Sequence, residues 1–140
     1  MIERMVGKKA PHFEMNALLA DKSFGQVSLK ESMEREKWTV LLFYPMDFTL
    51  VCPTEITAVS DRYDEFKELD TEVIGISTDS LYAHLAWVNT ERFKNGVGKL
   101  NFALASDQNH RVCKQYGVLI EEEGIALRGL FIISPTGELR

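Results

Sequence analysis

Two short apolar runs frame a stretch with helical periodicity. Residues 38–44 (WTVLLFY) and 72–77 (EVIGIS) are rich in residues that pack well on a pleated surface, and both are typical of buried strands. Between them, apolar residues recur at helical spacing and predict one helix from Cys52 to near Leu69. The residues on this face are Ile56, Val59, Tyr63 and Phe66. The order strand, helix, strand predicts a right-handed crossover, which places Cys52 at the carboxyl edge of the sheet.

The chain before this unit predicts a β-hairpin followed by a short helix. Residues 13–18 alternate loosely between apolar and polar, and residues 26–29 return as the second arm after a turn. Ser28 and Glu31 have the spacing of a capping box, which predicts a helix that opens there and runs to about residue 36.

Beyond residue 77 the pattern keeps alternating between helices and strands. The expected elements are a helix capped by Asp79 or Ser80, with Leu81, Leu85 and Val88 on one face, a strand at 102–105, a helix at 109–116 ended by Gly117, and a strand at 125–133 whose buried part is 130–133. The acidic residues 121–124 are interpreted as a solvated hairpin tip rather than a binding site. Residues 138–140 begin a further strand that the chain does not continue. The pattern as a whole predicts an α/β layered domain.

Composition and charge narrow the classes of function. A chain of 140 residues predicts one domain, residues 1–140, and its net charge of −5 argues against nucleic acid or an anionic membrane as partners. No run approaches the ~20 apolar residues of a membrane span, and the N-terminus does not have the pattern of a signal peptide. Two cysteines suit a reducing cytoplasm, and the dispersed histidines His12, His84 and His110 lack zinc-type spacing. We therefore expect a cytoplasmic protein with neither a metal nor a cofactor.

Cys52 is the candidate nucleophile. It lies between the strand ending at Tyr44 and the predicted helix, where Pro53 suits the first turn because a missing N–H costs nothing there. Free backbone N–H groups and the positive end of the helix dipole favour a thiolate at such a position. The alternative is that Cys52 is a small buried hydrophobe, which is the commoner role of a free cysteine.

The residues around Cys52 carry a family resemblance. Pro45-x-x-x-Thr49-x-x-Cys52, with FYP at 43–45 and TEI at 54–56, resembles the active-site signature of the peroxiredoxins, and the typical 2-Cys (AhpC/TSA, alkyl hydroperoxide reductase C-like) branch closely. The resemblance implies a thioredoxin-like fold with an N-terminal β-hairpin extension. Family members continue with a strand, a helix and a tail with a resolving cysteine. The chain therefore reads as a C-terminally incomplete domain, with that C-terminal strand and helix missing.

The resemblance implies a role for each site residue. Cys52 matches the peroxidatic nucleophile, which cycles through a sulfenic acid, and Arg128 matches the active-site arginine whose fork of donors holds thiolate and peroxide. Thr49 can supply a hydroxyl to the peroxide oxygens, and Pro45 can shield the pocket from water. Glu55 and Trp87 also match family positions and are interpreted as supporting residues.

Each of these residues has a plainer interpretation. Thr49 could be a helix N-cap, Pro45 a strand terminator, Arg128 a solvated strand residue and Trp87 part of the core. Cys113 has no counterpart among the family's resolving cysteines, and core packing is favoured for it.

The predicted function is thiol-dependent reduction of hydrogen peroxide and organic hydroperoxides. The expected partners are these peroxides, a thiol reductant (a thioredoxin-like protein or a small thiol) and further copies of the chain in a homodimer or larger homo-oligomer. A dithiol oxidoreductase is disfavoured because Cys52-Pro53-Thr54-Glu55 lacks the second cysteine of C-x-x-C. The remaining alternative is an incomplete domain that acts as a non-enzymatic interaction or chaperone-like module, or an inactive fragment, because an uncovered sheet edge invites association.

Overall fold

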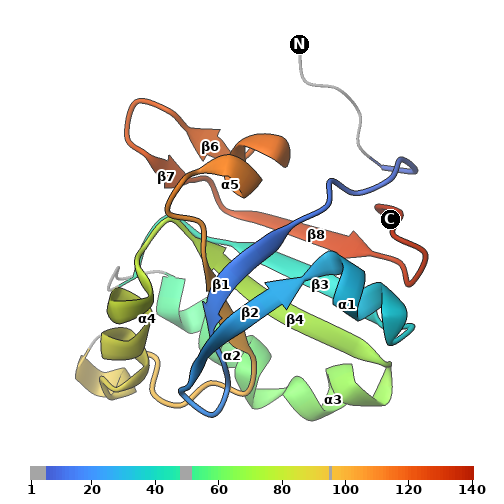
Figure 1. Ribbon diagram of the computed structural model, residues 1–140. Coiled ribbons are helices and arrows are strands. Elements are labelled where there is room, and N and C mark those ends of the chain that lie inside the picture. The colour runs from blue at the N-terminus through green and yellow to red at the C-terminus, as the bar shows by residue number, and fades with distance from the viewer. Residues whose placement is uncertain (1–5, 48–51, 95) are drawn as a thin grey trace.

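The computed structural model describes residues 6–47, 52–94 and 96–140, with the backbone alone at residues 52–54 and 93 (Figure 1). The elements in chain order are β1 (Glu14–Leu18), β2 (Phe24–Ser28), α1 (Leu29–Glu34), β3 (Trp38–Phe43), α2 (Cys52–Asp61), α3 (Tyr63–Glu68), β4 (Thr71–Ser77), α4 (Leu81–Val88), η1 (Arg92–Lys94), β5 (Ala103–Ser106), α5 (Arg111–Gln115), β6 (Leu119–Ile120), β7 (Ile125–Ala126) and β8 (Gly129–Ile133). The predicted alternation of strands and helices is confirmed.

The main sheet has six strands in the order β2-β1-β5-β4-β3-β8. Strands β3, β4 and β5 are parallel, while β1 pairs antiparallel with β5 and β8 pairs antiparallel with β3. The parallel strands end at Phe43, Ser77 and Ser106, so the segments that follow them meet at one edge of the sheet. Because β8 runs the other way, its first residue, Gly129, pairs with Phe43 at that same edge.

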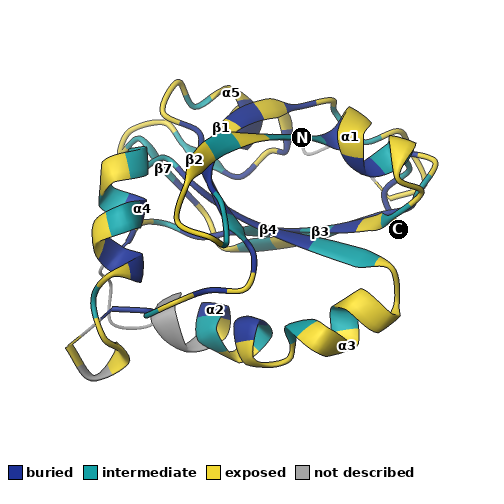
Figure 2. Ribbon diagram, turned by 60° about the horizontal axis from the view of Figure 1, so that its bottom comes forward, coloured by how far each residue is buried: buried dark blue, intermediate teal, exposed yellow. Residues whose placement is uncertain are grey.

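Helices cover both faces of the sheet (Figure 2). One core cluster lies on the side of α1 and α5 and includes Leu41, Ile76 and Ile133; the other lies on the side of α2, α3 and α4 and includes Ile56, Val73 and Trp87. Alternate residues of β3 serve the two clusters, as the twofold repeat of a strand requires. Burial of each such side chain contributes about 1.5–3 kcal/mol before the entropy cost of folding.

The N-terminal hairpin and its following helix match the prediction. β1 and β2 pair antiparallel with Glu14 opposite Ser28, and the Ser28 hydroxyl accepts the N–H of Glu31 at 3.2 Å as the N-cap of α1. Downstream, Ser80 caps α4 by accepting the N–H of Ala83 at 3.1 Å. Gly117 follows α5 with φ +72°, a conformation that glycine adopts at no steric cost.

The predicted single helix from Cys52 to Leu69 is wrong in one respect, because it is two helices. The chain turns at Arg62, which has φ −104° and ψ 17° and donates its N–H to the carbonyl of Val59 at 3.2 Å. This i to i−3 bond interrupts the α-helical ladder. Tyr63 and Phe66 still pack against the cluster under α2 and α3, so the apolar face continues across the break.

The predicted strand at 125–133 is also divided. β7 pairs with β6 in a separate two-stranded sheet, whereas β8 pairs with β3, and residues 127–128 connect them. The prediction of a buried segment at 130–133 is wrong for two of its residues, since Leu130 and Ile132 are 62% and 40% exposed. Both lie on the edge strand of the sheet, opposite Leu42 and Val40, where no further strand flanks them.

Residues 138–140, predicted to begin a strand, form isolated β-bridges instead, and Glu138 pairs with Lys9. Leu139 forms a bridge with Ile133, and its N–H donates to the Lys8 carbonyl at 2.9 Å. These residues therefore lie between the end of β8 and the segment of residues 7–9 (Figure 1). Among the described residues, no helix combines the length and the apolar character needed to cross a membrane.

Candidate active site

Cys52 begins α2, directly after the segment that follows β3. This confirms the predicted location of the cysteine at a helix start, at the carboxyl edge of the parallel strands. Thr49 and the Cys52 side chain lie outside the described residues. The backbone position alone supplies the helix-terminus environment that favours a thiolate.

Arg128 and Glu55 meet at this edge of the sheet. Arg128 precedes β8, and its Nη1 lies 3.3 Å from Oε1 of Glu55 in the first turn of α2. The two side chains are 42% and 52% exposed, so water screens their attraction and the pair stabilises the fold by at most about 1 kcal/mol. The contact brings a guanidinium to the turn of helix that Cys52 begins.

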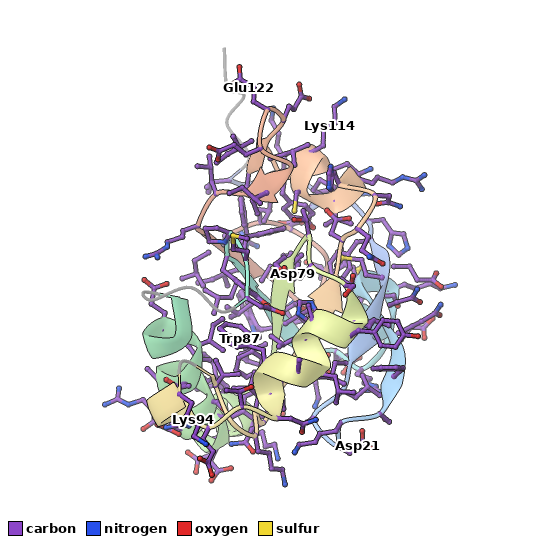
Figure 3. All side chains as sticks on the ribbon, turned by 90° about the vertical axis from the view of Figure 1, so that its left-hand side faces the viewer. Asp21, Asp79, Trp87, Lys94, Lys114 and Glu122 are labelled. Carbon is purple, nitrogen blue, oxygen red and sulfur yellow. The ribbon has the colours of Figure 1, made fainter. Side chains whose placement is uncertain are left out.

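Pro45 and Trp87 occupy different depths of the structure. Pro45 is half-buried. It follows Tyr44, the residue after β3, whose N–H donates to the carbonyl of Ile76 in β4 at 3.0 Å. Trp87 is fully buried on α4, and its ring lies 5.5 Å from that of Tyr44 in a tilted arrangement. Figure 3 shows Trp87 between α4 and α2. Core packing is thus established for Trp87, and its interpretation as a supporting residue of the site stays a prediction.

A buried polar network lies beside these residues. The His84 Nδ1 is 2.7 Å from Oδ2 of Asp47, and its Nε2 is 2.9 Å from the carbonyl of Ala105 in β5. Tyr44 donates its hydroxyl to the other carboxylate oxygen of Asp47 at 2.6 Å. The side chains of His84 and Asp47 are 0% and 1% exposed. Sequence reasoning did not assign any of these three residues to the site.

Asp79 extends this network to β4 and to the start of α4 (Figure 3). Its Oδ2 accepts the backbone N–H of Asp47 at 2.8 Å and the Ser77 hydroxyl at 2.7 Å. Carboxylate oxygens of Asp47 and Asp79 and a ring nitrogen of His84 all lie within 4.8 Å of one another, a grouping that could hold a metal ion. These ligand atoms are already engaged by hydrogen bonds, so the grouping is better described as a hydrogen-bond network than as a metal centre.

The network perturbs the pKa values of His84, Asp47 and Tyr44. Burial lowers the pKa of the His84 imidazole, but the hydrogen bond and charge of Asp47 and the Ala105 carbonyl more than offset it and leave this pKa raised. Burial raises the pKa of the Asp47 carboxyl, and the contacts with His84 and Tyr44 offset only part of that rise. Burial, with the charge of Asp47, raises the pKa of the Tyr44 phenol, which therefore stays a donor.

Cys113 lies on the other side of the sheet from α2. It is fully buried on α5, in the cluster on the α1 side, as its core-packing interpretation requires. Its backbone N–H donates to Oδ2 of Asp107 at 2.7 Å. Burial, together with the Asp107 carboxylate, raises the pKa of the Cys113 thiol, so it is protonated and unreactive at neutral pH.

The order of the predicted elements could have suggested part of the network. Asp47 and Asp79 follow two neighbouring parallel strands, which places both residues at one edge of the sheet. His84 lies four residues after Ser80, the N-cap of α4, and its position in the first turns of that helix turns it toward the same edge. The dispersed spacing of the histidines in sequence concealed this convergence.

The fold is that of a thioredoxin-like domain with an N-terminal hairpin, and its edge carries a cysteine at a helix start and an Arg–Glu pair. A family model, AhpC/TSA family, matches residues 6–140. The chain belongs to this family, the peroxiredoxins, which are thiol-dependent peroxidases.

Individual relatives agree with this assignment. The chain is 69% identical over 140 residues to a Bacillus subtilis protein named "Putative peroxiredoxin YkuU", covering all of this chain and 78% of that protein. It is 52% identical to the chloroplastic 2-Cys peroxiredoxin BAS1 of Spinacia oleracea, covering 97% of this chain and 51% of that protein. Among solved structures, the reduced 2-Cys peroxiredoxin of Plasmodium vivax superposes with a TM-score of 0.93 at 40% identity, covering 97% of this chain and 82% of that one.

Proposed function

We propose that this chain reduces hydrogen peroxide and organic hydroperoxides, with Cys52 as the peroxidatic nucleophile. The observation that carries the proposal is the junction at the carboxyl edge of the sheet. There Cys52 begins α2, and Glu55, in the first turn of the same helix, pairs with Arg128. Family membership supports the reaction class, and the edge supplies residues of the required chemistry.

In the proposed reaction, the Cys52 thiolate attacks one oxygen of the peroxide and the O–O bond breaks. The sulfur is oxidised to a sulfenic acid, and the other oxygen leaves, after protonation, as water or an alcohol. Two thiols of a reductant then restore the cysteine, the first by condensing with the sulfenic acid and releasing water, the second by reducing the resulting disulfide. A thioredoxin-like protein or a small thiol can supply them.

Arg128 and Thr49 have proposed roles in that step. The planar guanidinium of Arg128 offers several donors to the thiolate and to the developing charge on the departing oxygen, and Glu55 orients it from one side. Thr49 offers a hydroxyl that both donates and accepts. Pro45, which has no N–H, limits competing hydrogen bonds, and Trp87 supports the wall of the site from α4.

The setting of this activity is also a proposal. The chain has two cysteines, which do not form a C-x-x-C pair. This low number suits a reducing environment and favours a location in the cytoplasm. Exposed Leu130 and Ile132 on the edge strand β8 favour a homodimer or larger homo-oligomer. The same exposure favours a second function, in which the chain acts as an interaction or chaperone-like module without peroxidase activity.

A peroxide-consumption assay with dithiothreitol as reductant separates the two functions. The wild-type chain is expected to consume hydrogen peroxide catalytically, and Cys52→Ser to lose this activity because a serine hydroxyl is not ionised at neutral pH. Cys113→Ser is the matched control and is expected to retain it. Activity that survives in Cys52→Ser but not in Cys113→Ser would make the assignment wrong, and no activity in wild type would favour the interaction module.

A further inference from the structure

The Tyr44–Asp47–His84 network joins three separate parts of the chain in the protein interior. Tyr44 and Asp47 follow β3, His84 belongs to α4, and its acceptor Ala105 belongs to β5. Buried polar groups that bond to one another across elements fix those elements in a single arrangement, because any displacement leaves a donor or acceptor unsatisfied. The network is therefore a rigid junction under the carboxyl edge of the sheet.

The hydrogen bonds require His84 to serve two acceptors at once. The Ala105 carbonyl can only accept, so the Nε2 of His84 must carry a hydrogen. The Nδ1 faces a carboxylate oxygen of Asp47, which is the second acceptor. A neutral imidazole has one N–H and cannot donate to both. His84 thus satisfies both partners only as an imidazolium, or while sharing one proton with Asp47.

The network borders the segment that leads to Cys52, and its member Tyr44 belongs to the same core cluster as a residue of α2. Asp47 is the residue immediately before 48–51, and its backbone N–H is held by Asp79 at 2.8 Å. On the far side of the segment, Ile56 in α2 shares a core cluster with Tyr44 and Trp87. The arrangement of His84 and Asp47 can thereby set where α2 begins relative to the sheet.

We propose that His84, held by Asp47 and Ala105, is a positioning residue for the Cys52 reaction, and that loss of the proton it shares with these partners slows attack on peroxide. This inference rests on the proposed function. The titratable groups that face His84 are Tyr44 and Asp47 from the segment after β3 and Asp79 from the segment after β4; β5 contributes the Ala105 carbonyl. Asp47 and the Ala105 carbonyl raise the pKa of the buried imidazole, which favours its protonated form.

The test compares two pH profiles in the same reduced, full-length chain. One is the rate constant of Cys52 oxidation in a single turnover with hydrogen peroxide, and the other is the titration of the His84 ring followed by NMR. We expect the oxidation rate to fall by on the order of tenfold to a hundredfold as the pH rises, with a midpoint that coincides with the His84 titration. A midpoint that differs from the titration of His84 would overturn the inference.

Two variants move the midpoint in opposite directions, which a merely structural role would not do. Asp47→Asn removes the opposing charge and is expected to lower the pKa of His84 and the rate midpoint together, by about one pH unit or more. Tyr44→Phe removes a donor to the carboxylate, strengthens its hold on the imidazolium and is expected to raise both. His12→Gln, at an exposed histidine on the N-terminal segment, should change neither.

The outcomes separate this inference from the proposed function. If Asp47→Asn fails to fold, Tyr44→Phe alone still decides, because a shifted His84 titration with an unmoved rate midpoint contradicts positioning. Alkylation of Cys52 by iodoacetamide is measured in parallel. If the alkylation rate follows the His84 titration but peroxide does not react at any pH, the proposed function is contradicted and the link between His84 and Cys52 is retained. If neither the alkylation rate nor the peroxide rate follows the titration, the link is overturned.

Discussion

Arg128 and Glu55, 73 residues apart in the chain, meet with Nη1 and Oε1 3.3 Å apart. The contact joins the residue before the edge strand β8 to the first turn of α2. It exists because β8 runs antiparallel to β3, so that the start of one strand lies beside the end of the other. An arginine that is far from Cys52 in the sequence is thereby brought to the helix that Cys52 begins.

Arg128→Lys is expected to slow the reaction with peroxide by on the order of a hundredfold to a thousandfold, since one point charge cannot replace a planar fork of donors. The free energy of unfolding should change by less than about 1 kcal/mol, because the pair with Glu55 is exposed to water. Stopped-flow oxidation and chemical denaturation measure the two effects.

Arg92→Lys is the matched control for this substitution, because Arg92 also pairs with a carboxylate at the surface, at 2.7 Å to Asp61. It is expected to leave the peroxide rate unchanged. Equal losses of rate in the two variants would show that the effect is not specific to the position of Arg128, and would contradict its role in the site.

Thr49 is expected to act through its hydroxyl. Thr49→Val keeps the shape and removes the donor and acceptor, so the rate of Cys52 oxidation should fall by on the order of a hundredfold or more, whereas Thr49→Ser should be mild. Steady-state peroxide consumption with dithiothreitol compares them. Equal rates for the Val and Ser variants would remove Thr49 from the mechanism.

Cys113 is expected not to resolve the oxidised Cys52. It is fully buried on α5, on the opposite side of the sheet from α2, whereas a disulfide requires Cα atoms within ~7 Å. After one equivalent of peroxide, we expect Cys52 sulfenic acid that dimedone traps, and turnover that depends on an added small thiol. Non-reducing mass spectrometry is the measurement, and a Cys52–Cys113 disulfide in high yield would contradict the prediction.

The exposed edge of β8 is expected to contribute to self-association. Leu130 is 62% exposed beside the half-buried Leu42, so Leu130→Lys should weaken a dimer by placing a charge at its interface. Sedimentation velocity at micromolar concentration measures this, with Leu69→Lys, at another leucine that is 70% exposed, as the control. A monomeric wild-type chain would contradict the expected homo-oligomer, and an unchanged Leu130→Lys dimer would point instead to the loop around the active site.

Local patterns in the sequence predicted most of the elements. The strand at β3, the caps Ser28 and Ser80 and the glycine after α5 depend on side-chain periodicity and on backbone preferences within a few residues. The break at Arg62 was not predictable in this way, because the apolar face continues through it and only the hydrogen bonds reveal the turn.

The sequence by itself determined that Cys52 stands at the start of a helix, since a strand, a proline and a helical period fix that position locally. Only the tertiary structure decided which distant groups meet at the same edge of the sheet. The pairing of Arg128 with Glu55 depends on the direction of β8, and the meeting of His84 with Asp47 depends on the order of β3, β4 and β5 in the sheet. Strand order and direction arise from packing between residues far apart in the chain, and local periodicity carries no record of them.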